Sequence, residues 1–143
     1  MKALLPSMLV LMALTTASPA NVTYLPADQV KAAFEKGKPL LEVTGYKIHA
    51  SRRDGAGQVE VHEKDTDIVY VLTGTATLVT GGTVVGRKSV APEEIRGSDV
   101  QGGETREIKP GDVVVIPNGT PHWFKAVPAP MTYYVVKVRE GGK

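Results

Sequence analysis

The sequence predicts an all-β domain, an antiparallel sandwich or barrel, with one short helix near its N-terminus. Two observations support this prediction. From Leu40 onward, apolar and polar residues alternate with the period of two that β-strands have, and glycine or proline turn signals separate the runs. Before Leu40, residues 27–36 place apolar side chains at helical spacing, and Gly37 follows as a stop signal.

The alternating segments are short and are joined by recognisable turns. Gly81-Gly82 and Asn118-Gly119 favour tight turns, and Pro110-Gly111 suits a type II turn. The polar stretch 86–103 lacks periodicity, and we predict a long loop or flap over one end of the domain. The expected strands are residues 46–52, 58–62, 67–73, 75–80, 104–109, 112–116, 121–127 and 132–138.

Length, charge and the N-terminus limit the classes of function. The 143 residues suit one domain, and a net charge of +2 without a basic cluster argues against nucleic-acid binding. Residues 1–20 are predicted to be a signal peptide, because an apolar run follows Lys2 and Ser18-Pro19-Ala20 resembles a cleavage site. The run is short for a bilayer span, so we expect no stable membrane insertion after cleavage. Residues 21–143 would then form a single secreted or periplasmic domain without disulfides, since cysteine is absent.

Four side chains with metal-ligand chemistry are predicted to converge. Glu60 and His62 are two positions apart on one strand, so they point to the same face. Asp67 begins the next strand, and His122 follows a turn that Gly119 permits. If these strands line one barrel, two imidazoles and two carboxylates surround a divalent ion. The predicted metal ligands are Glu60, His62, Asp67 and His122.

Some of these residues have structural alternatives. Glu60 is equally suited to a salt bridge with Arg52 or Arg53, since both lie on the preceding strand. Asp65 is a second carboxylate close to Asp67 and competes with it as a ligand. The residue types alone leave these alternatives open.

The second half of this constellation resembles a motif of the cupin superfamily, which are small β-barrels of the jelly-roll type. The usual motif is Gly-x5-Pro-x-Gly-x2-His-x3-Asn. This chain matches it at Gly111, Pro117, Gly119 and His122, with Ala126 in place of the final asparagine.

The first half resembles the other cupin motif, Gly-x5-His-x-His-x3-4-Glu-x6-Gly, and departs from it in chemistry. His62 and Gly74 match, and Asp67 replaces the usual glutamate. Glu60 stands where the first histidine is expected, and Asp54 stands where the first glycine is expected. The exchange of histidine for Glu60 is the main departure from the family pattern.

The resemblance covers roughly residues 46–138 and implies a small secreted single-domain cupin. Its fold would be a jelly-roll barrel, or double-stranded β-helix, with a divalent metal inside, a small-molecule ligand and a homodimeric assembly. The extra carboxylate favours Mn or Fe, while Zn or Ni are also compatible with the donor set. Glu60 is the candidate general base if it does not bind the metal.

Strand parity nominates residues beside the metal. On residues 46–52 the less polar face carries Arg52, which we expect to point inward toward an anionic substrate, and His49 is expected at the surface. Lys137 is expected to mark the outer face of the last strand, which leaves Tyr134 inside. The predicted substrate-binding residues are Arg52, Phe124 and Tyr134, with plain core packing as the alternative.

Three kinds of function fit these predictions. The first is a metal-dependent enzyme acting on a small molecule, of dioxygenase, isomerase or lyase type, because cupins include all of these. The second is a non-catalytic binding protein in which the metal is structural, and the third is a metal-free barrel. Outward apolar residues support the implied homodimer, namely Ile68, Tyr70 and Trp123.

Overall fold

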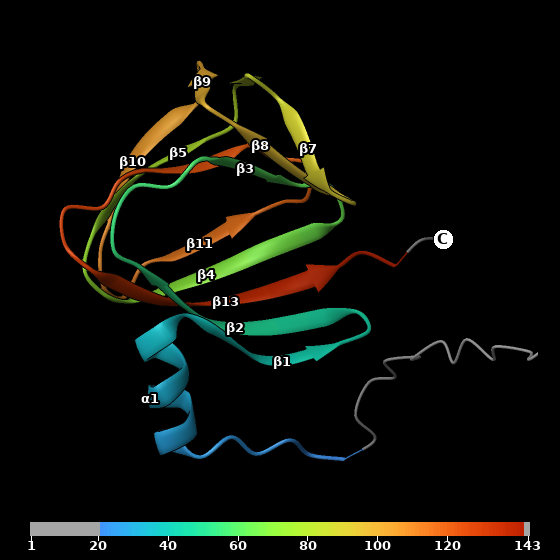
Figure 1. Cartoon of the computed structure of the whole chain (residues 1–143), viewed down its shortest axis with the longest axis vertical. Coiled ribbons are helices and arrows are strands. Elements are labelled where there is room, and N and C mark those ends of the chain that lie inside the picture. Colours follow the sequence, from blue (N-terminus) through green and yellow to red (C-terminus); the bar gives the residue numbers. More distant parts are fainter. Residues whose placement is uncertain (1–20, 142–143) are drawn as a thin grey trace, which may run out of the picture.

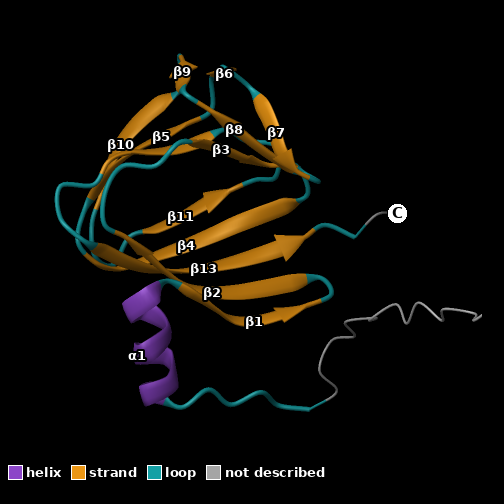
Figure 2. Ribbon diagram, viewed as in Figure 1, coloured by secondary structure: helices purple, strands orange, loops and turns teal. Residues whose placement is uncertain are grey.

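The structure, a computed structural model, describes residues 21–141, in which one helix precedes thirteen β-strands. Two antiparallel sheets face each other as a jelly roll, and the helix lies beneath the lower sheet (Figures 1 and 2). The predicted all-β fold with a short N-terminal helix is therefore confirmed. The predicted signal peptide lies outside the described residues. Within residues 21–141, no helix is both long enough and apolar enough to cross a membrane.

The helix and the lower sheet form one layered unit. Helix α1 (Ala27–Lys36) ends at Gly37, whose φ of 63° is the left-handed conformation that glycine adopts most easily. The helix packs against β2, and Phe34 meets the ring of Tyr134 edge to face at 4.9 Å. The order of the sheet is β1-β2-β13-β4-β11. Its strands are β1 (Lys38–Val43), β2 (Tyr46–Arg53), β4 (Asp65–Thr73), β11 (Val113–Ile116) and β13 (Met131–Arg139).

The upper sheet holds most of the remaining strands, in the order β10-β5-β12-β3-β8-β7. They are β3 (Val59–His62), β5 (Ala76–Thr80), β7 (Lys88–Ala91), β8 (Glu94–Gly97), β10 (Glu104–Ile108) and β12 (His122–Ala126). A small ribbon of β6 (Thr83–Val85) and β9 (Asp99–Gln101) stands at the top of the molecule in Figure 2.

The prediction of a loop over residues 86–103 is wrong. Strands β7, β8 and β9 lie there, and β8 extends the upper sheet by pairing with β3. The segment was missed because its exposed edge strand β7 carries no apolar alternation: all of its residues are solvent-exposed.

A hydrophobic core fills one part of the space between the sheets. Strands β4, β5, β10, β12 and β13 contribute to it, and Leu78 and Met131 are among its most deeply buried members. Gly74 lies at its margin with a φ of 77°, and a Cβ there would stand 2.6 Å from the Cβ of Met131. This close approach explains why the chain has glycine at that position.

Candidate metal centre

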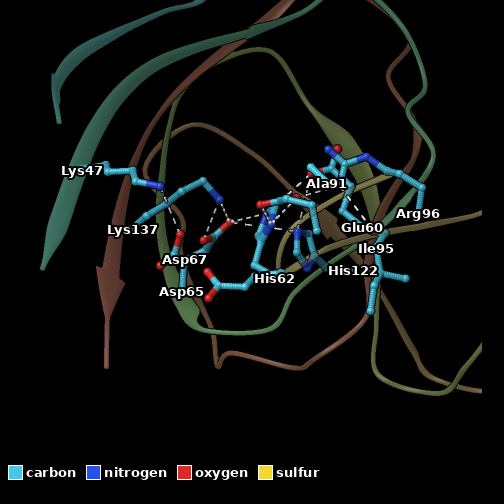
Figure 3. Close-up of polar contacts among 12 residues, drawn as sticks. Lys47, Glu60, His62, Asp65, Asp67, Ala91, Ile95, Arg96, His122 and Lys137 are labelled. Carbon is cyan, nitrogen blue, oxygen red and sulfur yellow. Dashed lines mark hydrogen bonds and ion pairs between the residues drawn. The ribbon is translucent and has the colours of Figure 1, made fainter. Parts of the chain in front are cut away.

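The predicted ligands come together in a cavity of about 380 Å³ between the two sheets. Glu60 and His62 project into it from β3, Asp67 from β4 and His122 from β12. The strand register brings His122 directly opposite Glu60, so residues 62 positions apart in the chain become neighbours. Figure 3 shows these side chains pointing toward one another.

Three of the four present donor atoms to a common point. The Oε2 atom of Glu60 lies 3.6 Å from Nε2 of His62 and 3.9 Å from Nε2 of His122. Ligand atoms of these three residues all lie within 4.8 Å of one another. Around an ion with bonds of about 2.0–2.2 Å, neighbouring donors stand roughly 3–3.6 Å apart. The two Glu60 distances are at or just above this range, so the group could hold a divalent ion if the donors draw together around it.

The outer nitrogen of each imidazole is occupied by another acceptor. The Nδ1 atom of His62 lies 2.8 Å from Oε1 of Glu94, and that of His122 lies 3.1 Å from the carbonyl oxygen of Thr120. Donation from Nδ1 leaves the lone pair on Nε2, which faces the common point. Burial lowers the pKa of His122, so this ring stays neutral, the form that binds metals.

Glu60 is held at its other oxygen by Arg53. Its Oε1 accepts a hydrogen bond of 3.0 Å from a guanidinium nitrogen of Arg53. Burial raises the pKa of the Glu60 carboxyl and is the largest single influence on it. The positive charges around the carboxyl, that of Arg53 first, and the hydrogen bond from Arg53 together outweigh burial, so the pKa lies below its ordinary value. Glu60 is therefore an anion, and it makes the alternative salt bridge to Arg53 while still offering Oε2 to the histidines.

Asp67 is close to the histidines, but an amine engages both of its oxygens. Its Oδ2 lies 3.4 Å from Nε2 of His62 and 4.0 Å from that of His122. The Nζ of Lys137 donates to Oδ1 at 2.8 Å and to Oδ2 at 2.7 Å. Asp67 thus stands beside the three-residue group as an ion-paired carboxylate. The competing carboxylate, Asp65, instead accepts hydrogen bonds from Lys47 and Arg139.

The parity predictions for β2 and β13 are wrong. Arg52 is exposed and pairs with Asp54, and Tyr134 lies against the helix, so neither lines the cavity. Phe124 does line it, as expected. The opposite faces of these strands reach the cavity, with side chains from His49, Ser51, Arg53, Tyr133, Val135 and Lys137.

The physical reason for this error is the polarity of the interior. The apolar face of β2, with Ala50 only 1% exposed, belongs to the side of the sheet that the helix packs on. The polar face looks into a cavity that is itself lined by charged groups. A rule that places the less polar face inward therefore selects the wrong side.

Several site residues were missed by the sequence reasoning. Glu94, Arg96 and Lys137 line the cavity, and Glu94 also accepts a hydrogen bond of 3.1 Å from Arg96. Arg53 lines it as well, although the sequence suggested Arg53 only as a salt-bridge partner of Glu60. The i, i+2 spacing of Glu94 and Arg96 within an otherwise polar stretch was a usable strand signal. Nothing in either motif points to Arg53 or Lys137.

Comparisons with known proteins bear on the family and the fold. Residues 14–142 match the protein family described as cupin. No curated protein matches the chain.

Solved structures provide further likenesses. A Bacillus halodurans protein is 14% identical, with a TM-score of 0.59 over 90% of this chain and 89% of its own. A cupin protein from Bacteroides fragilis is 18% identical, with a TM-score of 0.51 over 75% and 79% of the two chains. KdgF from Halomonas sp. is 19% identical, with a TM-score of 0.53 over 73% and 80%. At these identities the likenesses concern the fold.

Proposed function

The chain belongs to the cupin family, and on that basis we propose that it binds a divalent metal ion inside the barrel and acts on a small molecule there. Glu60, His62 and His122 would hold the ion. One observation carries the proposal: three donor atoms face one point, and the outer atom of each side chain is already held by another group. Such outer partners are what orient metal ligands in proteins.

The donor set bears on the identity of the ion. Glu60 adds an oxygen donor to two imidazoles, and Asp67 stands close enough to add another if Lys137 moves away from it. Oxygen-rich mixed sites favour Mn or Fe, and Zn or Ni remain compatible. When bound, such an ion acts as a Lewis acid toward an oxygen of the ligand.

The charges that line the cavity favour a small anionic ligand. Its walls carry three carboxylates, on Glu60, Asp67 and Glu94, and three cationic side chains, on Arg53, Arg96 and Lys137. These charges balance, so a divalent ion leaves the site with an excess of +2 that an anionic group would offset. Phe124 and other apolar residues form the rest of the wall. A dioxygenase-, isomerase- or lyase-like reaction fits this setting, and Glu60 would serve as the base only in a site where it does not bind the ion.

A second candidate is a non-catalytic ligand-binding protein in which the metal is structural. The altered first motif favours it, because Glu60 stands in place of a histidine and is already paired with Arg53, so it is not a free catalytic base. Removal of the metal separates the two candidates. A lower melting temperature with unchanged ligand affinity supports the structural role, whereas loss of turnover or of ligand binding supports the metal-dependent one.

The cellular setting and the assembly belong to the same proposal. We expect export to a secreted or periplasmic location after cleavage behind Ala20, which N-terminal sequencing of the recovered protein would test. A homodimer is supported by apolar side chains exposed on the lower sheet, namely Ile68, Tyr70, Val113 and Val115.

Elemental analysis of gently purified protein tests the metal. We expect a stoichiometric divalent ion in the wild type and in His49→Ala, which removes the cavity histidine that pairs with Glu42. The ion should vanish in His62→Ala and in His122→Ala. A wild-type protein without metal after supply of Mn(II), Fe(II), Zn(II) and Ni(II) would contradict the proposal.

A further inference from the structure

We propose that Arg53 is a positioning residue that makes Glu60 a one-oxygen metal ligand. It holds Oε1 of the carboxylate and leaves Oε2 directed at the two histidines. This inference rests on the proposed metal site. A histidine, which the family motif has at the position of Glu60, would bind an ion through one atom, and Arg53 would make Glu60 do the same. Arg53 lies outside both motifs. The sequence offered it only as one of two salt-bridge partners for Glu60, as an alternative to metal binding, whereas the structure shows that the two roles are compatible.

The contact between the two side chains is short and shielded. The guanidinium of Arg53 donates to Oε1 of Glu60 at 3.0 Å, and the two side chains are 18% and 19% exposed. The other oxygen lies 3.6 Å from Nε2 of His62. The hydrogen bond competes with an ion for the electron density of Oε1, so it favours coordination through Oε2 alone.

Arg53 is itself fixed from two further sides. Its Nε donates to the hydroxyl of Tyr133 at 3.0 Å, and its guanidinium lies 4.2 Å from the centre of the Phe124 ring. The rings of Phe124 and Tyr133 stack at 5.2 Å with an angle of 19° between them. The long side chain therefore has little rotamer freedom left to lose when a metal binds.

The loop before β3 leaves room for the guanidinium. A Cβ at Gly57 would stand 2.5 Å from a terminal nitrogen of Arg53, so only glycine fits while Arg53 keeps this pose. The loop is anchored at the same residue: the Gly57 amide donates to the Phe124 carbonyl at 3.0 Å, and the Trp123 indole donates to the Gly57 carbonyl at 2.7 Å. The surroundings are thus built around one conformation of the arginine.

Two neighbours provide a contrast. Arg52 has the same chemistry one residue away, but it is exposed and pairs with Asp54. Asp67 has the same distance to His62 as Glu60 within a few tenths of an ångström, but Lys137 contacts both of its oxygens. Of the two carboxylates Glu60 and Asp67, only Glu60 keeps one oxygen that no lysine or arginine contacts.

The test uses Co(II) alone as the probe, in the whole mature protein, with visible absorption as the readout. Arg53→Met should weaken Co(II) binding by about 10- to 100-fold, the range typical of groups that orient metal ligands, and should alter the Co(II) absorption bands. Arg53→Lys should recover part of the affinity. Arg52→Met, the matched control, should bind and absorb like the wild type.

A double-mutant cycle separates positioning from a general structural role. If Arg53 acts through Glu60, then Arg53→Met costs little further affinity in a Glu60→Gln background. The inference is wrong, while the metal site stands, if the double variant loses Co(II) affinity by the full product of the two single-variant losses. It is also wrong if Arg53→Met binds Co(II) like the wild type. A wild-type protein that binds no Co(II) overturns both. Tyr133→Phe keeps the ring stack and removes only the hydroxyl, so it gives the same test, with a smaller expected loss, should Arg53→Met fail to fold.

Discussion

The inner faces of β4 and β13 are apolar at one end of the barrel and charged at the other. At one end β4 presents Val71 and β13 presents Met131, both fully buried in the apolar core. At the other end the same strands present the buried Asp67 and the half-buried Lys137, which form an ion pair. Fold and site thus share strands, and four to six residues separate a close-packed core from a charged cavity. We expect substitutions at the apolar end to change mainly the free energy of unfolding, and substitutions at the polar end to change mainly metal and ligand binding.

The largest effect is expected at the apolar end, from Gly74→Ala. The new Cβ would meet Met131 at 2.6 Å and the Pro130 carbonyl oxygen at 2.8 Å, in a residue with a φ of 77°. Clash and backbone strain together should lower the free energy of unfolding by about 4 kcal/mol, as measured by urea denaturation. Gly81→Ala is the matched control, because its φ is 79° but nothing lies within 4 Å. It should cost only about 1 kcal/mol, and equal losses would refute the close-approach explanation.

A deletion in the core should come next. Leu78 is 1% exposed, so Leu78→Ala should lower the free energy of unfolding by about 3 kcal/mol, by the same measurement. The control Val113→Ala, at a residue 61% exposed, should change it by less than about 0.5 kcal/mol. The folded Leu78→Ala protein should still bind one metal ion per chain. A loss of metal in that variant would mean that the two ends are not separable.

At the polar end, Lys137→Met tests the buried ion pair. Without Lys137, Asp67 is left as an uncompensated buried charge, and the metal-free protein should lose about 2 kcal/mol of unfolding free energy. Excess Mn(II) should reduce that loss, because the ion would replace the missing positive charge. Lys109→Met, at an exposed lysine, should have little effect. An equal loss with and without Mn(II) would place the ion away from Asp67.

The smallest effect is expected at the rim, where Glu93 pairs with Arg139 and Lys64. The hydrogen bond from Arg139 lowers the pKa of Glu93 below its ordinary 4.5, so this pair stabilises the fold above that pH and is lost as the pH falls through the lowered value. Glu93→Gln should therefore lower the melting temperature by about 1 °C at pH 7, since exposed pairs contribute little. The difference should disappear at strongly acidic pH. A difference that grew on acidification would have the wrong sign.

The sequence predicted the elements of this barrel better than it predicted their orientation. The helix over residues 27–36 and the strands carrying both motifs follow from local signals, because glycine turns and the period of two act within a few residues. The faces of β2 and β13 do not, because the helix packs on one side and a polar cavity lies on the other. The partner Lys137 depends on the long-range pairing of β13 with β4, which no local pattern contains. Arg53 is only seven residues from Glu60, but the sequence could not choose between it and Arg52 because that choice depends on which face of β2 meets the cavity.

The central claim is that Glu60, His62 and His122 hold one divalent ion. A crystal structure of the protein grown with Mn(II), with anomalous diffraction data, tests it most directly. We predict one anomalous peak in the cavity, about 2.0–2.2 Å from Nε2 of both histidines and from one oxygen of Glu60, whose other oxygen stays on Arg53. A cavity without an anomalous peak at saturating Mn(II), or a peak bound elsewhere on the chain, would contradict the account.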